Sequence, residues 1–269
     1  MASETLPTPA PAPRALVTND DGIESEGLRR LARAALKAGL DVVVAAPGKD
    51  LSGTSASLTA VRTGGRVVCH ERRLAGLEGV PAYAVEATPA FITLLATRGA
   101  FGRPPDIVLS GINRGHNAGQ AVLHSGTVGA AFTAAAYGRR ALAVSLVAGE
   151  PFQWGTADRV VAHVLPALAR AEQGIVLNVN VPNVVPPTLR GLCRAKLSVF
   201  GAVRTNVAES GQGFITVEMA DVAAELEAGT DAALLAEGWA TFTLLQPLCE
   251  VDNPWFDDLL SGGDDLPGI

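Results

Sequence analysis

The sequence predicts an α/β fold, a three-layer sandwich in which a mainly parallel β-sheet lies between layers of helices. First, residues 15–46 read as a strand, a helix and a second strand, which together form a βαβ unit. Second, the run 41–46 is continuously apolar and rich in valine, as expected of a strand buried on both faces. Third, strand-like and helical segments keep alternating as far as residue 182, and this alternation favours a parallel sheet.

Each predicted strand of this sheet is a short apolar run that ends at a polar or turn-forming residue. The strands are expected at 15–18, 41–46, 67–69, 82–85, 106–110, 141–146 and 176–180. The helices are expected at 25–38, 88–98, 126–137 and 156–173. Gly39 ends the first helix, and Pro89 stands in the first turn of the second. The small residues of 126–137 suit close packing of that helix on the sheet.

Beyond Pro187 the pattern changes to the alternation of antiparallel strands, and Thr230-Asp231 caps a short helix that runs through Glu237. These strands are expected at 194–203, 214–219 and 241–245. We therefore expect four regions along the chain. They are a disordered leader at 1–14, an α/β core at 15–187, a C-terminal β-rich extension packing on the core at 188–250, and an acidic tail at 251–269.

The composition limits the classes of partner. A net charge of -6 with 18% charged residues leaves no basic footprint for a nucleic-acid duplex. The chain has no apolar run of about eighteen residues that would span a membrane, and its proline-rich start lacks the features of a secretory signal. The three cysteines are scattered without zinc-binding spacing, which is typical of a reducing compartment. We expect a cytoplasmic protein.

The pair Asp20-Asp21 directly follows the first strand and precedes the first helix. In an open α/β sheet this places two carboxylates at the carboxyl end of a strand, where such folds bind ligands. Adjacent carboxylates repel each other, and a divalent cation would neutralise them. The structural alternative is an Asx-turn followed by a helix N-cap, which needs no ligand.

Two further polar loops follow parallel strands, at 51–59 and 110–127, and should emerge at the same edge of the sheet. A hydroxyl and an amide oxygen from these loops would complete an all-oxygen site suited to Mg²⁺, Mn²⁺ or Ca²⁺ rather than Zn²⁺. Ser125-Gly126-Thr127 precedes an Ala-rich helix, whose N-terminus suits a phosphate. Metal and phosphate sites together indicate metal-assisted phosphoester hydrolysis.

Each of these loop residues also has a purely structural interpretation. Residues 52–57 could form a flexible surface loop, and Ser125 could be an ordinary N-cap. Asn113 and Asn117 could adopt left-handed turns beside their glycines. His116 and His124 are typical of incidental loop histidines. The occurrence of all these residues at three successive strand ends favours the functional interpretation.

Taken together, these motifs resemble the survival protein SurE family, whose members are metal-dependent 5'/3'-nucleotidases and acid phosphatases. The resemblance is carried by motifs that occur in the family's order over about 15–248. They are Thr18-Asn19-Asp20-Asp21-Gly22-Ile23, Ala46-Pro47, 52–55 with 57–59, Thr88-Pro89, 105–117, 125–128, 178–182 and the closing segment from Thr230-Asp231 to Pro247-Leu248.

The resemblance implies a Rossmann-like core, a C-terminal β extension that helps to form a homodimer or homotetramer, and a small phosphate monoester as substrate. It implies one divalent metal ion, Mg²⁺ or Mn²⁺, held by Asp20, Asp21, Ser52 and Asn113. The substrate phosphate would approach Asn117, Ser125, Gly126 and Thr127, and Asn19 would hold the loop or the phosphate. Asp20 and Asp21 would be catalytic, either by direct attack on phosphorus or by activating a water.

The chain departs from the family pattern on the substrate side. Residues 48–51 replace a usual Asp-Arg-Asn-Arg, and Phe91-Ile92 replaces a usual Asp-Cys. The departures expected to bear on substrate choice are Leu51, Ala56, Phe91, Ile92 and His124. They favour, as an alternative to nucleotides, a phosphate monoester that is a non-nucleotide pathway intermediate.

Three other classes of protein are alternatives to this one. A haloacid-dehalogenase-type phosphatase has acids two residues apart, but Gly22 stands two after Asp20. A dinucleotide-binding oxidoreductase needs a Gly-x-Gly-x-x-Gly turn where this chain has two acids, which would repel a pyrophosphate. A non-catalytic relative that binds a metal or nucleotide stays open as an alternative.

Overall fold

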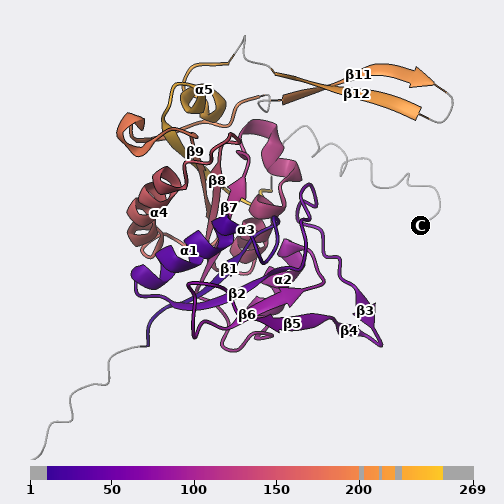
Figure 1. Cartoon of the computed structure of the whole chain (residues 1–269), viewed down its shortest axis with the longest axis vertical. Helices are drawn as coiled ribbons and strands as arrows, with labels where there is room; N and C mark the ends of the chain where they lie inside the picture. The colour runs from indigo at the N-terminus through magenta and orange to yellow at the C-terminus, as the bar shows by residue number, and fades with distance from the viewer. Residues whose placement is uncertain (1–10, 200–202, 212–213, 222–225, 251–269) are drawn as a thin grey trace, which may run out of the picture.

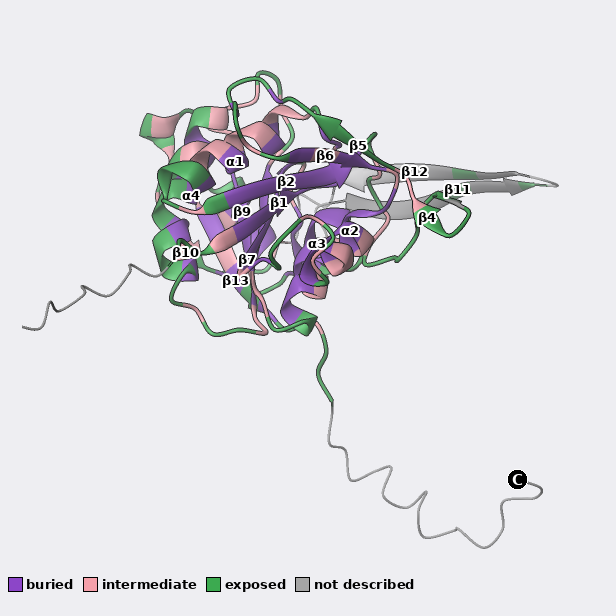
Figure 2. Cartoon of the chain, turned by 90° about the horizontal axis from the view of Figure 1, so that it is seen from below, coloured by how far each residue is buried: buried purple, intermediate pink, exposed green. Residues whose placement is uncertain are grey.

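A nine-stranded sheet forms the centre of the molecule in this computed structural model, which describes residues 11–199, 203–211, 214–221 and 226–250 (Figure 1). The acidic tail predicted at 251–269 and most of the predicted leader lie outside the described residues. The strand order is β10-β13-β9-β8-β7-β1-β2-β6-β5. Figure 2 shows the central strands of this sheet as buried.

Six neighbouring strands of the sheet run parallel, which confirms the predicted fold class. They are β1 (Arg14–Thr18), β2 (Asp41–Pro47), β6 (Ala82–Val85), β7 (Ile107–Arg114), β8 (Arg140–Leu146) and β9 (Val176–Val181). At one edge β5 (Cys69–Arg72) pairs antiparallel with β6. At the other, β13 (Ala240–Leu245) pairs antiparallel with β9, and β10 (Leu192–Arg194) pairs parallel with β13.

Two small hairpins lie outside this sheet. The first joins β3 (Arg62–Thr63) to β4 (Arg66–Val67). The second joins β11 (Val203–Gly211) to β12 (Phe214–Asp221), and these two strands pair only with each other (Figure 1).

Helices cover both faces of the sheet and enclose two separate apolar cores. On one face lie α1 (Glu26–Lys37) and α4 (Trp154–Leu168), where Leu31 and Val161 belong to the same buried cluster. On the other lie α2 (Pro89–Thr97) and α3 (Gly126–Ala136), with Ile92 and Val128 in the second cluster. The remaining helices are α5 (Asp231–Ala236) and the 3₁₀ turns η1 (Gly119–His124) and η2 (Pro186–Thr188). This is the three-layer arrangement that the alternating pattern predicted.

The prediction was wrong in four places. The strand expected at 67–69 is interrupted at Val68, because β4 ends at Val67 and β5 begins at Cys69. The segment 194–203 is not one strand, because β10 ends at Arg194 and β11 begins at Val203. The helix predicted to reach Gln173 ends at Leu168, where the N–H of Arg170 bonds to the carbonyl of Ala167 and tightens the last turn. Within the predicted loop 110–127, β7 continues to Arg114 and η1 forms a 3₁₀ turn.

Part of the predicted C-terminal extension belongs to the main sheet. β13 pairs with β9 over Thr241–Leu245, and β10 pairs with β13, so both strands extend the core sheet beyond β9. The boundaries at 187/188 and 250/251 stay predictions.

Candidate active site

The turn between β1 and α1 is held by Asn19, which is fully buried. Its Nδ2 donates to the carbonyl of Gly22 at 3.2 Å and to the hydroxyl of Ser25 at 2.6 Å, and its Oδ1 accepts from the N–H of Gly22 at 3.2 Å. Gly22 has φ +99°, a left-handed conformation that favours glycine. Of the two roles expected for Asn19, the contacts show the first, holding the loop.

Asp20 is 3% exposed and contacts the first turn of α3. Its Oδ1 accepts a short hydrogen bond from the Thr127 hydroxyl, and its Oδ2 accepts from the Thr127 N–H at 3.1 Å. Burial raises the pKa of Asp20 above its ordinary 3.8, the charge of Asp21 adds to this, and the bonds from Thr127 oppose it. The sequence therefore places a carboxylate that resists ionisation at the positive end of a helix.

Gly126 is required by the close approach of α3 to Asp20. A Cβ at this position would lie 2.8 Å from Asp20 Oδ2 and 3.1 Å from the hydroxyl oxygen of Thr54. Ser125 caps α3, since its hydroxyl accepts from the N–H of Val128 at 3.1 Å. Gly126 and Thr127 thus lie against the Asp20 carboxylate, at the sheet edge where the sequence places both segments, and Ser125 is the ordinary N-cap of the structural interpretation.

Asp21 is paired with Arg114 at the end of β7. Its Oδ2 accepts from the Arg114 backbone N–H at 3.2 Å, and its Oδ1 lies 3.3 Å from Arg114 Nε. The Asp21 side chain is only 3% exposed, whereas that of Arg114 is 49% exposed. Burial raises the pKa of Asp21, and the Arg114 charge opposes this rise.

A bulge in β7 brings Asn113 and Arg114 to this edge of the sheet. Ser110 pairs with Ala143, but Asn113 pairs with Ser145, so two residues of β7 stand where β8 has one. Bulges of this kind re-aim side chains beside functional sites. The Nδ2 of Asn113 donates to the carbonyl of Gly115 at 2.6 Å, which assigns its amide oxygen as the atom available to a cation.

The loop after β2 is tied to Asp20 through its backbone, because the N–H of Leu51 donates to the Asp20 carbonyl at 2.8 Å. Ser52 is exposed, and its hydroxyl donates to Asp50 Oδ1 at 2.7 Å. Asp50 Oδ2 in turn lies 3.8 Å from Arg114 Nη2. Ser52 therefore joins the carboxylate pair through Asp50 and Arg114, and its role as a metal ligand stays a prediction.

Asn117 lies in a buried hydrogen-bonded network with Ser145, Asn178 and Asn180. Its N–H donates to Asn180 Oδ1 at 2.7 Å, its Nδ2 donates to the Ser145 hydroxyl at 2.8 Å, and its carbonyl accepts from Asn178 and Asn180. These contacts fix the chain between β7 and η1. A contact of Asn117 with the substrate phosphate stays a prediction.

Sequence reasoning missed Arg114 and Asp50, the two charged residues that connect the acid pair to Ser52. Arg114 stands inside the motif 105–117, directly after Asn113, and a cation next to a predicted acidic site is the signal that could have found it. Asp231 was expected only as part of a helix cap. It is fully buried and accepts from the N–H groups of Gly119 and Ser198, both at 2.9 Å.

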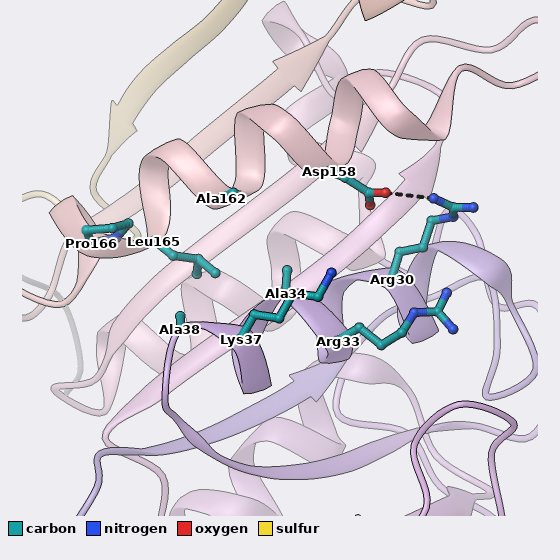
Figure 3. A pocket seen from close by; sticks show the side chains of 9 residues that line it. All are labelled: Arg30, Arg33, Ala34, Lys37, Ala38, Asp158, Ala162, Leu165 and Pro166. Carbon is teal, nitrogen blue, oxygen red and sulfur yellow. Dashed lines mark hydrogen bonds and ion pairs between the residues drawn. The ribbon is translucent and has the colours of Figure 1, made fainter.

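A cleft of about 330 Å³ adjoins the Asp20 edge of the sheet. Its lining includes Leu51 and Thr54, the loop residues closest to Asp20 and Gly126, together with Lys49, Glu86 and Thr88. A second cavity of similar volume lies between α1 and α4, where Arg30 Nη1 pairs with Asp158 Oδ2 at 2.7 Å (Figure 3). Neither cleft is lined by the predicted site residues themselves, but the cleft beside the loop after β2 is joined to them, because the N–H of Leu51 bonds to the Asp20 carbonyl and the Thr54 hydroxyl lies beside Gly126.

Comparison with known proteins places this geometry in a family. The family model described as "Survival protein SurE" matches residues 15–201. The chain belongs to the SurE family. The matched range contains Asn19, the pair Asp20-Asp21 that follows β1, the loop after β2 and the first turn of α3.

Relatives with this name cover most of the chain. A protein from Chloroflexus aggregans named 5'-nucleotidase SurE is 35% identical and covers 91% of this chain and 96% of its own length. The protein of the same name from Methylococcus capsulatus is 34% identical, with 94% and 97% covered. The crystal structure of the SurE protein from Aquifex aeolicus is 27% identical, has a TM-score of 0.74, and covers 94% of this chain and all of that chain.

The chemistry of the donor set fits a hard divalent cation at this SurE site. The carboxylates of Asp20 and Asp21 are both buried, and the charge of Asp21 raises the pKa of Asp20. The nearby cation Arg114 pairs with Asp21 and leaves the charge of Asp20 without a cation among the described residues. In the part of the chain that the structure describes, no group of three or more His, Cys, Asp or Glu could hold a metal. A cation here would depend on two carboxylates with neutral oxygens from Asn113, Ser52 and water, the environment that Mg²⁺ and Mn²⁺ accept.

Proposed function

We propose that this protein is a divalent-metal-dependent phosphatase that hydrolyses nucleoside 5'-monophosphates or 3'-monophosphates and releases inorganic phosphate. The observation that carries the proposal is the contact between Asp20 and Thr127, which joins the acid pair that follows β1 to the N-terminus of α3. Carboxylates for a cation and a helix terminus for a phosphate thereby share one edge of the sheet. The name 5'-nucleotidase SurE, carried by relatives about 34% identical over most of the chain, supports the same reaction.

The metal site of the proposal is one Mg²⁺ or Mn²⁺ with Asp20, Asp21 and Asn113 as ligands and Ser52 as a fourth. When bound, such an ion would offset the charge of the phosphoryl oxygens and lower the pKa of a coordinated water. Asp20 and Asp21 must both be ionised to serve as ligands, against the rise in pKa that burial causes. Asn19 keeps the two acids in place by closing the turn behind them.

The phosphate would lie at the N-terminus of α3. Residues 125–127 present the positive end of the helix dipole there, and Gly126, which has no side chain, lets this helix end lie directly against Asp20. The leaving group would occupy the adjoining cleft, where Lys49, Glu86 and Thr88 supply polar groups among apolar walls. One of the two acids attacks phosphorus or orients the attacking water.

A release assay for inorganic phosphate tests this proposal. The protein is freed of metal with a chelator and supplied with Mg²⁺ or Mn²⁺, and nucleoside 5'- and 3'-monophosphates are compared with sugar phosphates and para-nitrophenyl phosphate. The proposal predicts turnover that depends on the added metal and is fastest with nucleotides. No turnover with any metal or ester contradicts it and favours a non-catalytic metal- or nucleotide-binding relative.

A second substrate class, non-nucleotide phosphate monoesters, is favoured by the position of two departures from the family. Ala56 and His124 are both exposed, and their loops meet where the N–H of Ser55 donates to the His124 carbonyl at 3.3 Å. Ile92, by contrast, is fully buried in the core beneath α2 and cannot contact a substrate. A clear preference for sugar phosphates in the same assay would assign this class.

The assembly and location of the protein are part of the same proposal. We propose a homodimer or homotetramer formed through the C-terminal segments, and a cytoplasmic enzyme. Every helix of the described ranges is too short or too polar to cross a membrane. Light scattering coupled to gel filtration tests the assembly, and a monomer at all concentrations contradicts it.

A further inference from the structure

The guanidinium of Arg114 occupies the position of a counter-cation for the acid pair. Its Nε lies 3.3 Å from Asp21 Oδ1, and its backbone N–H bonds to Asp21 Oδ2, so one residue contacts both oxygens of that carboxylate. The Asp21 side chain is 3% exposed, and Arg114 pairs with it. A divalent ion bound by Asp21 must therefore share or replace this interaction.

A second carboxylate lies within reach of the same side chain. Asp50 Oδ2 is 3.8 Å from Arg114 Nη2, and the Asp50 side chain is 53% exposed. Asp50 Oδ1 accepts both the N–H and the hydroxyl of Ser52, so its position is held by the loop after β2. Arg114 thus stands between a buried acid and an exposed one, on a side chain that is itself half exposed.

We infer that Arg114 is a competitor of the metal ion: its guanidinium pairs with Asp21 and Asp50 in the metal-free protein and keeps only its pair with Asp50 when a divalent cation binds. This inference rests on the proposed metal site. It assigns Arg114 a positioning role, since the guanidinium acts through Asp21 and Asp50 and does not itself contact the phosphate ester. Arg114 therefore weakens metal binding while it stabilises the metal-free fold.

The physical reason is the repulsion between a guanidinium and a divalent cation that share one carboxylate. Asp21 is shielded from water, so its interactions with charge are screened less than those of a surface acid. A flexible arginine with an alternative partner can leave without losing its ion pair. Removal of the Arg114 charge should therefore raise metal affinity, and removal of Asp50 should lower it.

Titration calorimetry with Mn²⁺ on the full-length, chelator-treated protein tests the inference. Arg114→Gln should bind Mn²⁺ about threefold to tenfold more tightly than the unmodified protein, on the scale of a partly buried ion pair. Arg114→Lys keeps the charge and should lie closer to the unmodified protein. Arg190→Gln is the matched control, because Arg190 is 53% exposed and pairs with Glu237 away from the site. It should leave the affinity unchanged.

Asp50→Asn tests separately whether Asp50 is the alternative partner of Arg114. It should weaken Mn²⁺ binding in the unmodified protein but have little effect in the Arg114→Gln background, because Asp50 acts through Arg114. Equal effects of Asp50→Asn in both backgrounds contradict this role of Asp50. The metal-free Arg114→Gln protein should also melt at a lower temperature and gain more from Mn²⁺ than the unmodified protein.

The outcomes separate this inference from the proposed function. Unchanged or weaker Mn²⁺ binding by Arg114→Gln overturns the inference and leaves the metal site standing. Equal tightening by Arg114→Gln and Arg190→Gln also overturns it, because that result reflects net charge alone. No Mn²⁺ binding by the unmodified protein overturns both the metal site and the inference.

Discussion

Thr127 donates to both carboxylate oxygens of Asp20, through its hydroxyl to Oδ1 and through its backbone N–H to Oδ2. The two residues are 107 positions apart, and this contact fixes the first turn of α3 against the end of β1. Asp20 is almost fully buried, so the two bonds replace the water that the carboxylate loses. The contact is therefore a requirement of the fold as well as a part of the site.

Thr127→Val should destabilise the protein by about 1–3 kcal/mol, because it leaves Asp20 Oδ1 buried without its hydroxyl donor. Thr127→Ser keeps the hydroxyl and should lose much less. Urea unfolding of the metal-free proteins measures both variants. A loss for Thr127→Ser as large as that for Thr127→Val would contradict the prediction, because it would show that the methyl group contributes as much stability as the hydroxyl.

Gly126→Ala should lower both stability and phosphatase activity. The new Cβ would lie 2.8 Å from Asp20 Oδ2 and 2.9 Å from Asp20 Cβ, so either α3 or the carboxylate must move. Gly155→Ala in α4 is the matched control, since its Cβ meets nothing closer than Pro186 at 3.7 Å. Thermal melting and phosphate release compare the two variants, and equal behaviour of both would contradict the close approach at Gly126.

The raised pKa of Asp20 makes the stability of the metal-free protein depend on pH with a defined sign. Burial favours the protonated acid in the folded state, so the folded protein holds its proton to higher pH than the unfolded chain. This contribution is fully present below the ordinary pKa of 3.8 and is lost as pH rises through the raised value. Unfolding free energies of the unmodified protein and Asp20→Asn, measured from pH 4 to 8, should differ increasingly in favour of the variant. A pH-independent difference would count against this prediction.

Asp231 should be essential for the loop between β7 and η1. Its carboxylate is fully buried and accepts from the backbone of Gly119, Ser198 and Ala232. Asp231→Ala should cost about 2–5 kcal/mol by leaving buried N–H groups without acceptors, whereas Asp231→Asn retains one oxygen and should cost less. Urea unfolding measures the order of the two variants, and the reverse order would contradict it.

The sequence was sufficient for the layer order and for the meeting of the acid pair with residues 125–127. Both follow from rules about parallel strands, whose carboxyl ends share one edge of the sheet. The place of β13 did not follow, because an alternating run such as 241–245 shows a half-buried strand without showing which sheet it joins. The end of α4 at Leu168 is likewise set by a single tightened turn.

The sequence predicts at which edge of the sheet the site residues lie, but it does not predict which side chains they contact. Asn117 resembles a loop ligand in sequence, but it is engaged by Asn178 and Asn180, which lie more than sixty residues away along the chain. Arg114 was not predicted because its role depends on Asp21, a partner 93 positions away. Contacts between side chains that are far apart in the sequence depend on tertiary packing, which a local sequence pattern does not predict.

The central claim is that the acid pair Asp20-Asp21, which follows β1, supports metal-dependent hydrolysis of a phosphate monoester. Its most direct test is the rate of para-nitrophenyl phosphate hydrolysis with saturating Mn²⁺ in Asp20→Asn, Asp21→Asn and Asp158→Asn, the last being an acid 42% exposed and away from the site. The account predicts a loss of about a hundredfold or more in the first two folded proteins and unchanged activity in the third, on the scale of lost charge stabilisation at a reacting centre. Activity retained by both Asp20→Asn and Asp21→Asn would contradict it.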